Sequence, residues 1–414
     1  MQRAAEARAR LTPALLREPP FRRYWSAQTI SLFGDQISGL ALPLSAVLAL
    51  HAGANQMGFL TALIWLPSLL FGLHAGALVD RRGQRRMTMI AADLGRFALL
   101  TTIPVAYACG ALTLAQLYAV AFGAGAMSVL FNVSDSTLFV ALVAPDRYVD
   151  AQSLIQGSRA LSFVGGPSLG GVMVALLHAP FAIAADALSF LGSALLLHRT
   201  DADEPSPDDE PEAGTTRAGV RFIVSSPVIR PLLAATATVN LFTFGFAALF
   251  ILYAVRRLHV SPGLLGVVLG AGAVGGLVGA AVTKRIAAAL GLGRACALGC
   301  LVFAAPGALV PLAGGPRPLV LAMLFSAEFL SGFGVMLLDI TISAIFAAVI
   351  PDQFRARVMG AYQAVNFGVR PLGAIGAGAL GGAVGLRSTL WIAVAGATLA
   401  FIWMLAPSVR RLVL

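Results

Sequence analysis

Long apolar runs alternate with short polar segments along almost the whole chain of 414 residues. A run of roughly 20 apolar residues is long enough to cross the hydrocarbon core of a bilayer, which is about 30 Å thick. Backbone groups inside lipid must be hydrogen-bonded within their own segment, so such runs are helices, and the period-two alternation of a membrane β-barrel is missing. The pattern predicts twelve membrane-spanning helices, at approximately 24–50, 57–79, 87–109, 112–133, 151–177, 180–197, 229–255, 263–282, 294–312, 319–349, 359–382 and 388–406.

Composition agrees with this pattern, because 58% of the residues are hydrophobic and only 12% are charged, whereas soluble globular chains carry about 25% charge. The net charge of +10 raises the question of nucleic-acid binding. If the N-terminus is cytoplasmic, however, almost all loop bases fall inside, and the outside loops hold only Arg256, Arg257, Arg317 and Arg387. This asymmetry is the positive-inside rule. We therefore expect a multi-pass protein of the cell (cytoplasmic) membrane with both termini in the cytoplasm and no nucleic-acid partner.

One polar segment, 200-TDADEPSPDDEPEAGTTR-217, interrupts the series of spans and holds seven of the 19 acidic residues. Its composition is typical of a disordered connector, and it divides the twelve spans into six and six. We predict an all-α membrane protein made of two six-helix pseudo-repeat halves. The predicted units are a cytoplasmic N-terminal segment 1–23, an N-terminal half 24–199, an acidic cytoplasmic linker 200–228, a C-terminal half 229–406 and a cytoplasmic tail 407–414.

Three anchor points relate the two halves. The pairs are 76-GALVDRR-82 with 279-GAAVTKR-285, 144-APD-146 with 350-IPD-352, and Pro167 with Pro371, at offsets of 203, 206 and 204. Because each half has an even number of spans, both begin on the same side of the membrane and the repeat is parallel. Proteins of this construction bind small molecules between their halves near the midplane, so we expect a cavity there.

Charged residues inside the spans are the main candidates for chemistry, because each costs at least about 2.5–3.5 kcal/mol at a helix centre and usually faces a cavity or a partner. Asp35 lies near the midplane of the first span, and Gln28, Ser31 and Ser38 share its helix face through 3-4-3 spacing. We expect this face to line the cavity, with Asp35 binding a proton or a cationic substrate in turn. The alternative is that Asp35 is permanently paired with a base and only orders the bundle.

The second half has no acid at the equivalent position, where Asn240 and Thr243 continue a polar stripe instead. Glu328 and Asp339 lie three helical turns apart on the tenth span, so they share a face that lines the cavity or is tied to a neighbouring helix. The sequence assigns no role to Asp186.

Bases inside the spans are the candidate partners of these acids. Asp93 and Arg96 form an i, i+3 pair and are expected to neutralise each other, while Arg159 and Arg370 are candidate cations for the remaining acids.

No feature of the sequence indicates an enzyme, a cofactor or a metal site. The histidines and cysteines lack the spacing of zinc ligands or of a catalytic triad. The one lysine, Lys284, does not stand in a phosphate-binding Gly-rich loop, which argues against an ATP-driven pump.

Two motifs give the chain a resemblance to the major facilitator superfamily over nearly its whole length. The segment 76-GALVDRRGQRR-86 is similar to the signature loop between helices 2 and 3, and 166-GPSLGG-171 is similar to the helix 5 motif of the drug–proton antiporter branch. The second motif departs from the family at Ser153 and Ser162, where the pattern has glycine, and 114–132 lacks the arginine of the helix 4 motif. The segments 21–38 and 144–171 look most like enterobactin exporters and macrolide efflux permeases.

The resemblance implies the major facilitator fold and a secondary active transporter. It would export small amphipathic compounds (drug, macrolide or siderophore-like) by proton antiport with alternating access, as a monomer. A facilitator or importer of a small metabolite is the alternative. The residues expected to couple protons and substrate are Asp35, Glu328, Asp339 and Arg159.

The resemblance also implies a latch that closes the cytoplasmic side, in which Asp80 faces the N-terminus of helix 11. One of the arginines of the loop would pair with Asp135. The alternative is that these arginines only set topology through anionic headgroups. The latch residues would be Gly76, Asp80, Arg81, Gly83, Arg85, Arg86 and Asp135.

The helix 5 motif is expected to seal the resting cavity against leaks, through close approach of small residues and a proline kink. Generic close packing of helices is the alternative. Its residues here are Gly166, Pro167, Gly170 and Gly171.

Overall fold

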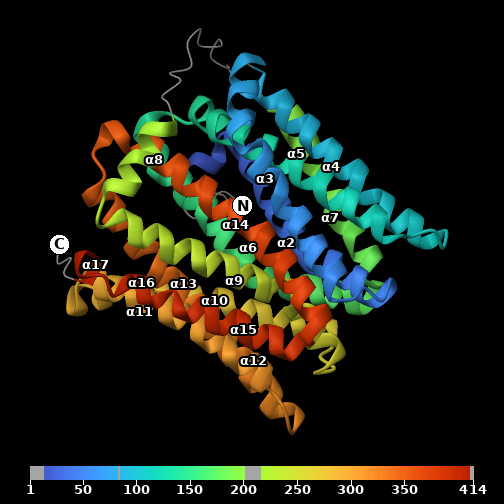
Figure 1. The fold of residues 1–414 in the computed structure, drawn as a ribbon. Coiled ribbons are helices and arrows are strands. Elements are labelled where there is room, and N and C mark those ends of the chain that lie inside the picture. The colour runs from blue at the N-terminus through green and yellow to red at the C-terminus, as the bar shows by residue number, and fades with distance from the viewer. Residues whose placement is uncertain (1–13, 83, 201–215, 411–414) are drawn as a thin grey trace, which may run out of the picture.

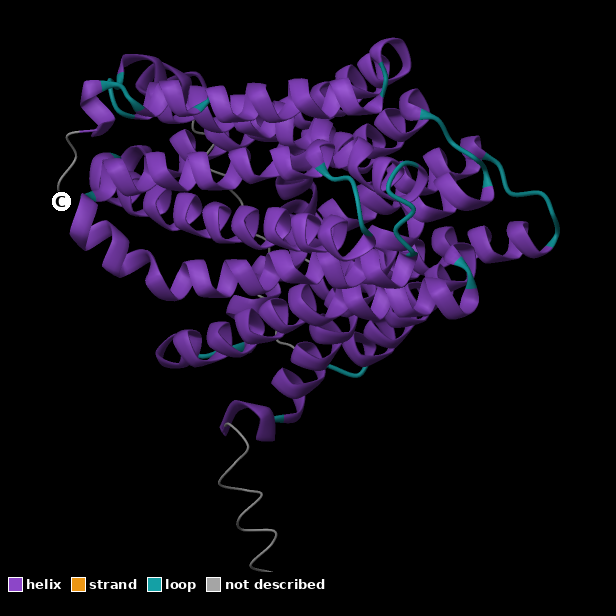
Figure 2. Ribbon diagram, turned by 90° about the horizontal axis from the view of Figure 1, so that it is seen from below, coloured by secondary structure: helices purple, strands orange, loops and turns teal. Residues whose placement is uncertain are grey.

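The computed structural model describes residues 14–82, 84–200 and 216–410; for 73–82, 216–220, 352, 353 and 356 it describes the backbone alone. All regular elements in these ranges are helical, and Figures 1 and 2 show long helices joined by short loops. Twelve helical segments are long and apolar enough to cross a membrane, which confirms the predicted spans. Several helices continue past the predicted ends, as α10 (Pro262–Leu290) does beyond 282, because a helix does not stop where its apolar run stops.

The first six spans occupy the blue to green part of Figure 1. Thr113 caps the fourth of them by accepting a hydrogen bond from the Gln116 N–H, as N-cap threonines do. The spans are α2 (Pro19–Leu44) continued by η2 (Ser45–Ala49), α3 (Ala54–Arg82), α4 (Arg85–Ala108), α5 (Leu114–Leu142), α6 (Tyr148–Leu177) and α7 (Ala179–His198). Two short turns, η1 (Ala14–Arg17) and η3 (Pro145–Arg147), precede α2 and α6.

The second six spans occupy the yellow to red part of Figure 1. They are α9 (Ile229–Arg256), α10, α11 (Leu292–Ala304) continued by η4 (Ala305–Ala308) and α12 (Leu309–Leu312), α13 (Arg317–Val349), α14 (Asp352–Val384), and α15 (Leu386–Leu399) continued by α16 (Phe401–Met404). A last short helix, α17 (Pro407–Arg410), follows them.

A further helix, α8 (Thr216–Ser225), lies within the predicted linker 200–228, almost entirely after the stretch 200–217 that is expected to be disordered. Ile223 is buried there, and the ring of Phe222 stacks on Phe354 of α14 with centroids 5.5 Å apart. This end of the segment is helical because it carries an apolar face that packs on α14. The stretch 201–215 lies outside the described residues, and the unit boundaries stay a prediction.

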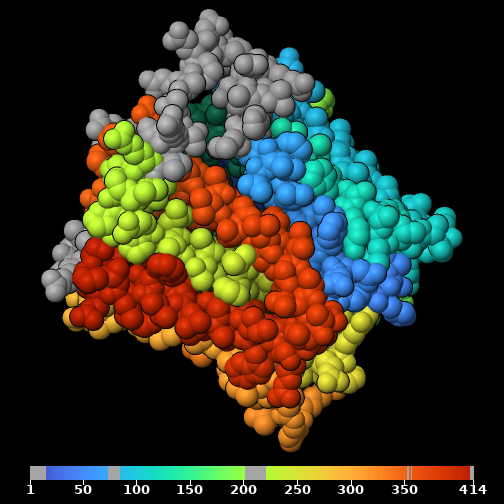
Figure 3. Space-filling model, in the orientation of Figure 1, coloured from blue at the N-terminus to red at the C-terminus, as the bar shows by residue number. Residues whose placement is uncertain are grey.

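The first six spans and the second six spans form two groups, which contact each other mainly through two helix pairs. In the first group α2 packs on α6 and α7, and α4 on α5 and α7; in the second α13 packs on α10 and α11, and α9 on α14 and α15. The groups are joined by α3 against α14 and by α6 against α10, and Figure 3 shows the first of these contacts, with α14 in orange beside α3 in blue.

Glycines set how closely the groups approach. A Cβ at Gly171 of α6 would lie 2.7 Å from the Pro262 carbonyl oxygen of α10, and one at Gly58 of α3 would lie 2.8 Å from Gly378 Cα of α14. Both contacts lie toward the turns 50–53 and 257–261, at the end of the bundle opposite the chain termini. The two groups are therefore closed against each other at that end.

Matching turns in the two groups hold different residues. The turn between α6 and α7 has His178 with φ 67° and ψ 153°, and the turn between α14 and α15 has Gly385 with φ 88° and ψ 156°. This backbone conformation is essentially reserved for glycine, because a Cβ clashes there. His178 therefore holds strain that its counterpart avoids.

Candidate functional site

Arg96 of α4 is the centre of a charged cluster inside the first group of helices. It forms an ion pair with Asp93, one turn earlier on the same helix, so the expected i, i+3 pair is present. Its Nη1 also lies 4.0 Å from Asp35 Oδ1 on α2. Arg96 and Asp93 are buried, whereas the side chain of Asp35 is 48% exposed. Because an ionised carboxylate facing lipid is costly, we expect the open side of Asp35 to face the interior of the bundle.

Aromatic rings hold the Arg96 guanidinium in place. Its central carbon lies 4.0 Å from the ring centroid of Phe190 on α7 and 4.5 Å from that of Phe131 on α5. A desolvated guanidinium over a ring gains about 2 kcal/mol or more from the ring quadrupole. The cation is thus anchored by α4, α5 and α7 while it faces an acid on α2.

Asp186 of α7 belongs to the same cluster, which the sequence did not indicate. It is 1% exposed, its Oδ1 accepts a hydrogen bond of 3.1 Å from Ser189 Oγ, and it interacts electrostatically with Asp35 and Arg96. Gly34 makes room for it, since a Cβ there would lie 2.9 Å from Ser189 Cβ. The available signal was the polar stripe Asp186, Ser189 and Ser193 at helical spacing on an otherwise apolar span.

Asp135 of α5 has described partners on α2 and α6, while its pairing with an arginine of the loop stays a prediction. It accepts a hydrogen bond of 2.6 Å from the Tyr24 hydroxyl and another from Gln28 Nε2, and the cation that acts on it is Arg159 of α6. Gln28 therefore bonds to Asp135, and Ser31 is buried in the same helix.

The other predicted latch residues are only partly described. Arg86 donates a hydrogen bond to the Thr200 carbonyl oxygen after the end of α7, and Arg85 is buried. The side chains of Gly76, Asp80 and Arg81, and the whole of Gly83, lie outside the described residues. The latch stays a prediction.

Arg370 of α14 is a base of the second group that is likewise surrounded by aromatic rings. Its Nε donates a hydrogen bond of 2.9 Å to Asn240 Oδ1 on α9, and Asn240 Nδ2 donates one of 3.0 Å to Asn366. The guanidinium carbon lies 4.4 to 4.6 Å from the ring centroids of Phe367, Phe244 and Trp65.

Two of these contacts matter for the arrangement of the two groups. The rings of Phe367, Phe244 and Trp65 form an aromatic cage around Arg370, and Trp65 belongs to α3 of the first group, so the cage includes a ring from across the junction. Asp339 of α13 acts electrostatically on Arg370.

A cavity of about 620 Å³ lies between the two groups of helices. Its walls come from Gln36 and Gly39 of α2, from Phe163 and Pro167 of α6, and from α10, α11 and α13. Glu328 of α13 is the one charged side chain among the described residues that line it. A cavity of this volume with mostly apolar walls suits a drug-sized molecule.

Glu328 stands at the edge of a second cavity as well. This space of about 260 Å³ is lined by Thr243, Phe246 and other residues of α9, α11 and α15, and it shares Glu328 and Ser331 with the larger one. No described residue forms a salt bridge with Glu328. Gly272 of α10 leaves space for its carboxylate, because a Cβ there would lie 3.4 Å from Glu328 Oε2.

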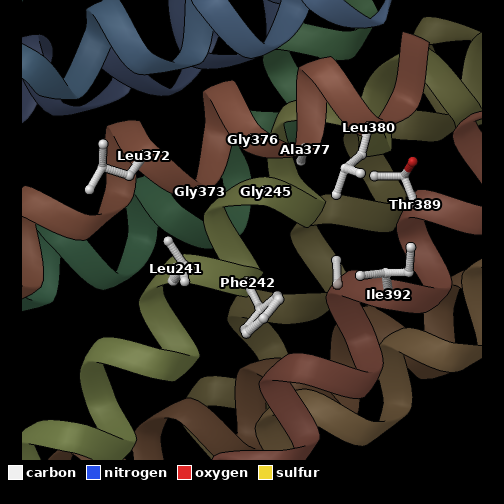
Figure 4. A pocket seen from close by; sticks show the side chains of 11 residues that line it. Leu241, Phe242, Gly245, Leu372, Gly373, Gly376, Ala377, Leu380, Thr389 and Ile392 are labelled. Atoms are coloured by element: carbon white, nitrogen blue, oxygen red, sulfur yellow. The ribbon is translucent and has the colours of Figure 1, made fainter. Parts of the chain in front are cut away.

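A third pocket, shown in Figure 4, lies within the second group alone. It measures about 150 Å³ and is lined by Leu241 and Phe242 of α9, by Gly373 and Gly376 of α14, and by α15. Thr389 supplies the one polar side chain among its described lining residues, and its hydroxyl already donates to the Gly385 carbonyl oxygen. This pocket is too small and too apolar to hold a polar ligand.

The helix 5 motif lies where three helices meet. A Cβ at Gly170 would lie 3.2 Å from Ile37 Cα on α2, and one at Gly266 of α10 would lie 3.0 Å from Gly171 Cα. Pro167 lines the larger cavity. The motif thus stands between that cavity and the closed end of the bundle.

The structure brings some predicted residues together and separates others. Asp35 joins Arg96, while Glu328 lies in the second group and Asp339 lines none of the three cavities described. The sequence missed Gln36, Phe163 and Trp65, because uncharged and aromatic residues on an apolar helix give no signal of what they face. The described residues contain no group of three His, Cys, Asp or Glu that could hold a metal ion.

Comparisons with known proteins agree with this architecture. Residues 10–412 match the profile of a family described as transmembrane secretion effectors. The multidrug efflux pump Tap of Mycobacterium tuberculosis is 30% identical over 380 residues, which cover 88% of this chain and 87% of the pump. The transporter YfiS of Bacillus subtilis, described as of the major facilitator type, is 28% identical over 381 residues, covering 87% and 86%. The nucleoside transporter NupG superposes with a TM-score of 0.77 at 11% identity, covering 93% of this chain and 99% of NupG.

Proposed function

This chain belongs to the family of transmembrane secretion effectors within the major facilitator superfamily, and we propose that it exports small amphipathic compounds by proton antiport. It is a multi-pass membrane transporter and not an enzyme. The observation that carries the proposal is the cavity of about 620 Å³ between the two groups of helices, with Glu328 as its charged lining residue.

The walls of this cavity support lipophilic substrates that are neutral or weakly cationic. Rings from Phe163 and Phe303 and the backbone of small residues offer apolar contact, with few of the hydrogen-bonding groups that a sugar needs. Glu328 has no salt bridge to a base among the described residues, so a cationic substrate group would complete its pairing. The similarity to Tap supports a drug as substrate, and macrolide or siderophore-like compounds belong to the same chemical range.

The coupling ion would be the proton, and Asp35 is its proposed entry point. Asp35 is the exposed member of a cluster whose other groups are buried, so it can exchange protons with water in the interior. Protonation of Asp35 would remove its attraction to Arg96 and alter the contact between α2 and α4. The remaining coupling candidates are Glu328, Asp339 and Arg159, of which Arg159 acts on Asp135.

Alternating access would follow from the two junctions between the groups. The distribution of bases supports cytoplasmic termini, and the groups are closed at the opposite end, so the arrangement would be inward-facing. Outward opening would then separate α3 from α14 and α6 from α10, and the latch at Asp80 would close the cytoplasmic side. The helix 5 motif would keep the far end sealed until that change.

A flux assay tests the proposal. The purified protein is placed in proteoliposomes with a pH-sensitive dye, a proton gradient is imposed, and lipophilic cations, macrolides and siderophores are added in turn. We expect proton flux that depends on one of these compounds. Equilibration of a compound without any effect of the gradient would instead support a facilitator, and uptake driven inward would support an importer.

The role of Glu328 is tested by Glu328→Gln, which keeps the shape of the side chain and removes its charge. We expect binding of tetraphenylphosphonium to weaken about tenfold or more, since a desolvated charge pair is lost, while a neutral macrolide binds as before. Tryptophan fluorescence quenching measures both affinities. Asp150→Asn, at an exposed position of α6, is the matched control, and equal weakening for both ligands would contradict the role.

A further inference from the structure

The Arg96 cluster contains more acids than bases. Asp35, Asp93 and Asp186 come from α2, α4 and α7, and Arg96 is the one cation among the described residues that acts on all three. If all three acids were ionised, the interior of the first group would hold an uncompensated charge of two. Burying an unpaired carboxylate costs so much that such a group takes up a proton instead. At least one of the three is therefore protonated.

The surroundings of the three acids differ and identify which one holds that proton. Asp93 forms the close ion pair with Arg96 and is best kept ionised. Asp35 lies farther from Arg96, at 4.0 Å, and is 48% exposed, so water helps to stabilise its charge. Asp186 is 1% exposed and its hydrogen-bond donor is the neutral hydroxyl of Ser189, at 3.1 Å. Its environment is the least suited to a negative charge.

A second hydroxyl completes the argument. Ser38 of α2 lies one turn after Asp35, and its Oγ is buried without a hydrogen-bond partner among the described residues, although it faces the Asp186 carboxyl. Ser189 already donates to Asp186 Oδ1, so the other oxygen remains for a proton. A protonated Oδ2 could donate to Ser38 Oγ, and both buried groups would then be satisfied.

We propose that Asp186 is a resident protonated carboxyl and a second proton-binding site that exchanges its proton with Asp35. When Asp35 releases its proton to interior water, the proton on Asp186 moves to the Asp35 carboxylate. Arg96 then turns its charge toward the newly ionised Asp186. One O–H bond breaks as another forms, and no other reactant is needed. Asp35 thus exchanges protons with water, and Asp186 is the buried carboxyl that holds a proton for it. The exchange rests on the proposed proton coupling, whereas the resident proton does not.

The groups that face Asp186 come from each charged neighbour of α7. They are Asp35 from α2 and Arg96 from α4, and Arg96 in turn pairs with Asp93. The facing hydroxyls are those of Ser189 on α7 and Ser38 on α2. The cluster is therefore complete within α2, α4 and α7.

Infrared spectroscopy of the full-length protein tests the resident proton without any transport. We expect the wild type to show the C=O stretching band of a buried protonated carboxyl that persists to mildly alkaline pH. Asp186→Asn should remove this band, and Ser38→Ala and Ser189→Ala should shift it by changing its hydrogen bonds. Asp150→Asn, at an exposed position, serves as the control that leaves it in place.

Two results would overturn the proposal. If the band survives Asp186→Asn, or does not move in either serine variant, Asp186 is not the protonated acid. If the band disappears in Asp186→Asn but substrate-dependent proton flux in proteoliposomes stays at the wild-type level, the proton is a spectator and there is no exchange with Asp35. We expect that flux to fall several-fold. Absence of flux in the wild type would contradict antiport, and the infrared result alone would then decide whether Asp186 holds a resident proton.

Discussion

Arg96 in the first group of helices and Arg370 in the second are both surrounded by aromatic rings, but they have different polar partners. Each guanidinium lies within 4.6 Å of at least two aromatic ring centroids. Arg96 has carboxylates as its partners, whereas the hydrogen-bond partner of Arg370 is the amide of Asn240. The two bases do not occupy equivalent positions of the repeat, because Arg96 lies on the third span of its half and Arg370 on the fifth. Each half nevertheless holds a base among aromatic rings, and different groups face that base.

This difference separates two tasks. A carboxylate can gain and lose a proton, so the surroundings of Arg96 can change charge during a transport cycle. An amide cannot titrate, so the hydrogen bond of Arg370 to Asn240 keeps its strength through the same cycle, and Asp339 is the titratable group that acts on Arg370. We infer that proton coupling is concentrated in the first group, while the second contributes substrate contact through Glu328 and a junction through Arg370 and Trp65.

The largest effect is expected when the exposed acid of the first group is removed. Asp35→Asn should abolish substrate-driven proton flux, at least about a hundredfold in rate as for loss of a proton-transferring group, because no group remains to pass protons to water. Proteoliposome flux measures this, with counterflow of a neutral substrate as the readout of intact binding. Uphill transport at the wild-type rate would show that Asp35 is not needed for coupling.

The two arginines themselves should differ in stability. Arg96→Gln leaves buried acids without their cation and should cost about 3–5 kcal/mol. Arg370→Gln removes a charged hydrogen bond to a neutral amide and should cost about 1.5–3 kcal/mol. Thermal unfolding in detergent, followed by tryptophan fluorescence, compares them. Equal losses would mean that the acids around Arg96 do not depend on its charge.

The matching turns at His178 and Gly385 allow a stabilising substitution in the first half and a destabilising one in the second. His178→Gly should relieve backbone strain of about 1–3 kcal/mol and raise the unfolding temperature. Gly385→Ala should lower it, since it introduces the strain that His178 carries. The same thermal assay tests both, and a drop for His178→Gly would show that contacts of the imidazole outweigh the strain.

The smallest effect is expected at the junction between the groups. Trp65→Leu removes one ring from the Arg370 cage and should weaken the closed arrangement by about 0.5–2 kcal/mol. Labelling of a single cysteine placed at Ala54 of α3, whose Cβ faces Gly381 of α14, on a background without native cysteines, should become faster as the far end opens. Phe190→Leu, which removes a ring from Arg96 within one group, should leave the labelling rate unchanged. Faster labelling in both variants would point to general loosening.

Local pattern was sufficient for the number of spans and for the family, because the length and apolarity of a membrane helix are properties of a continuous segment. It was also sufficient for the pair Asp93 and Arg96, whose contact is set by helix geometry alone. For Asp35 the sequence left two alternatives, lining of the cavity or pairing with a base, and it did not identify which base.

Contacts between helices were decided only by the tertiary structure. Asp186 interacts with Asp35, and Arg370 contacts the ring of Trp65. Gln28 donates a hydrogen bond to Asp135, which lies 107 positions later in the chain. Apolar helices can rotate about their axes without changing their hydropathy, so the sequence leaves open which face meets which neighbour. Packing of small residues such as Gly34 against Ser189 fixes that rotation, and with it the set of groups that share the interior charge.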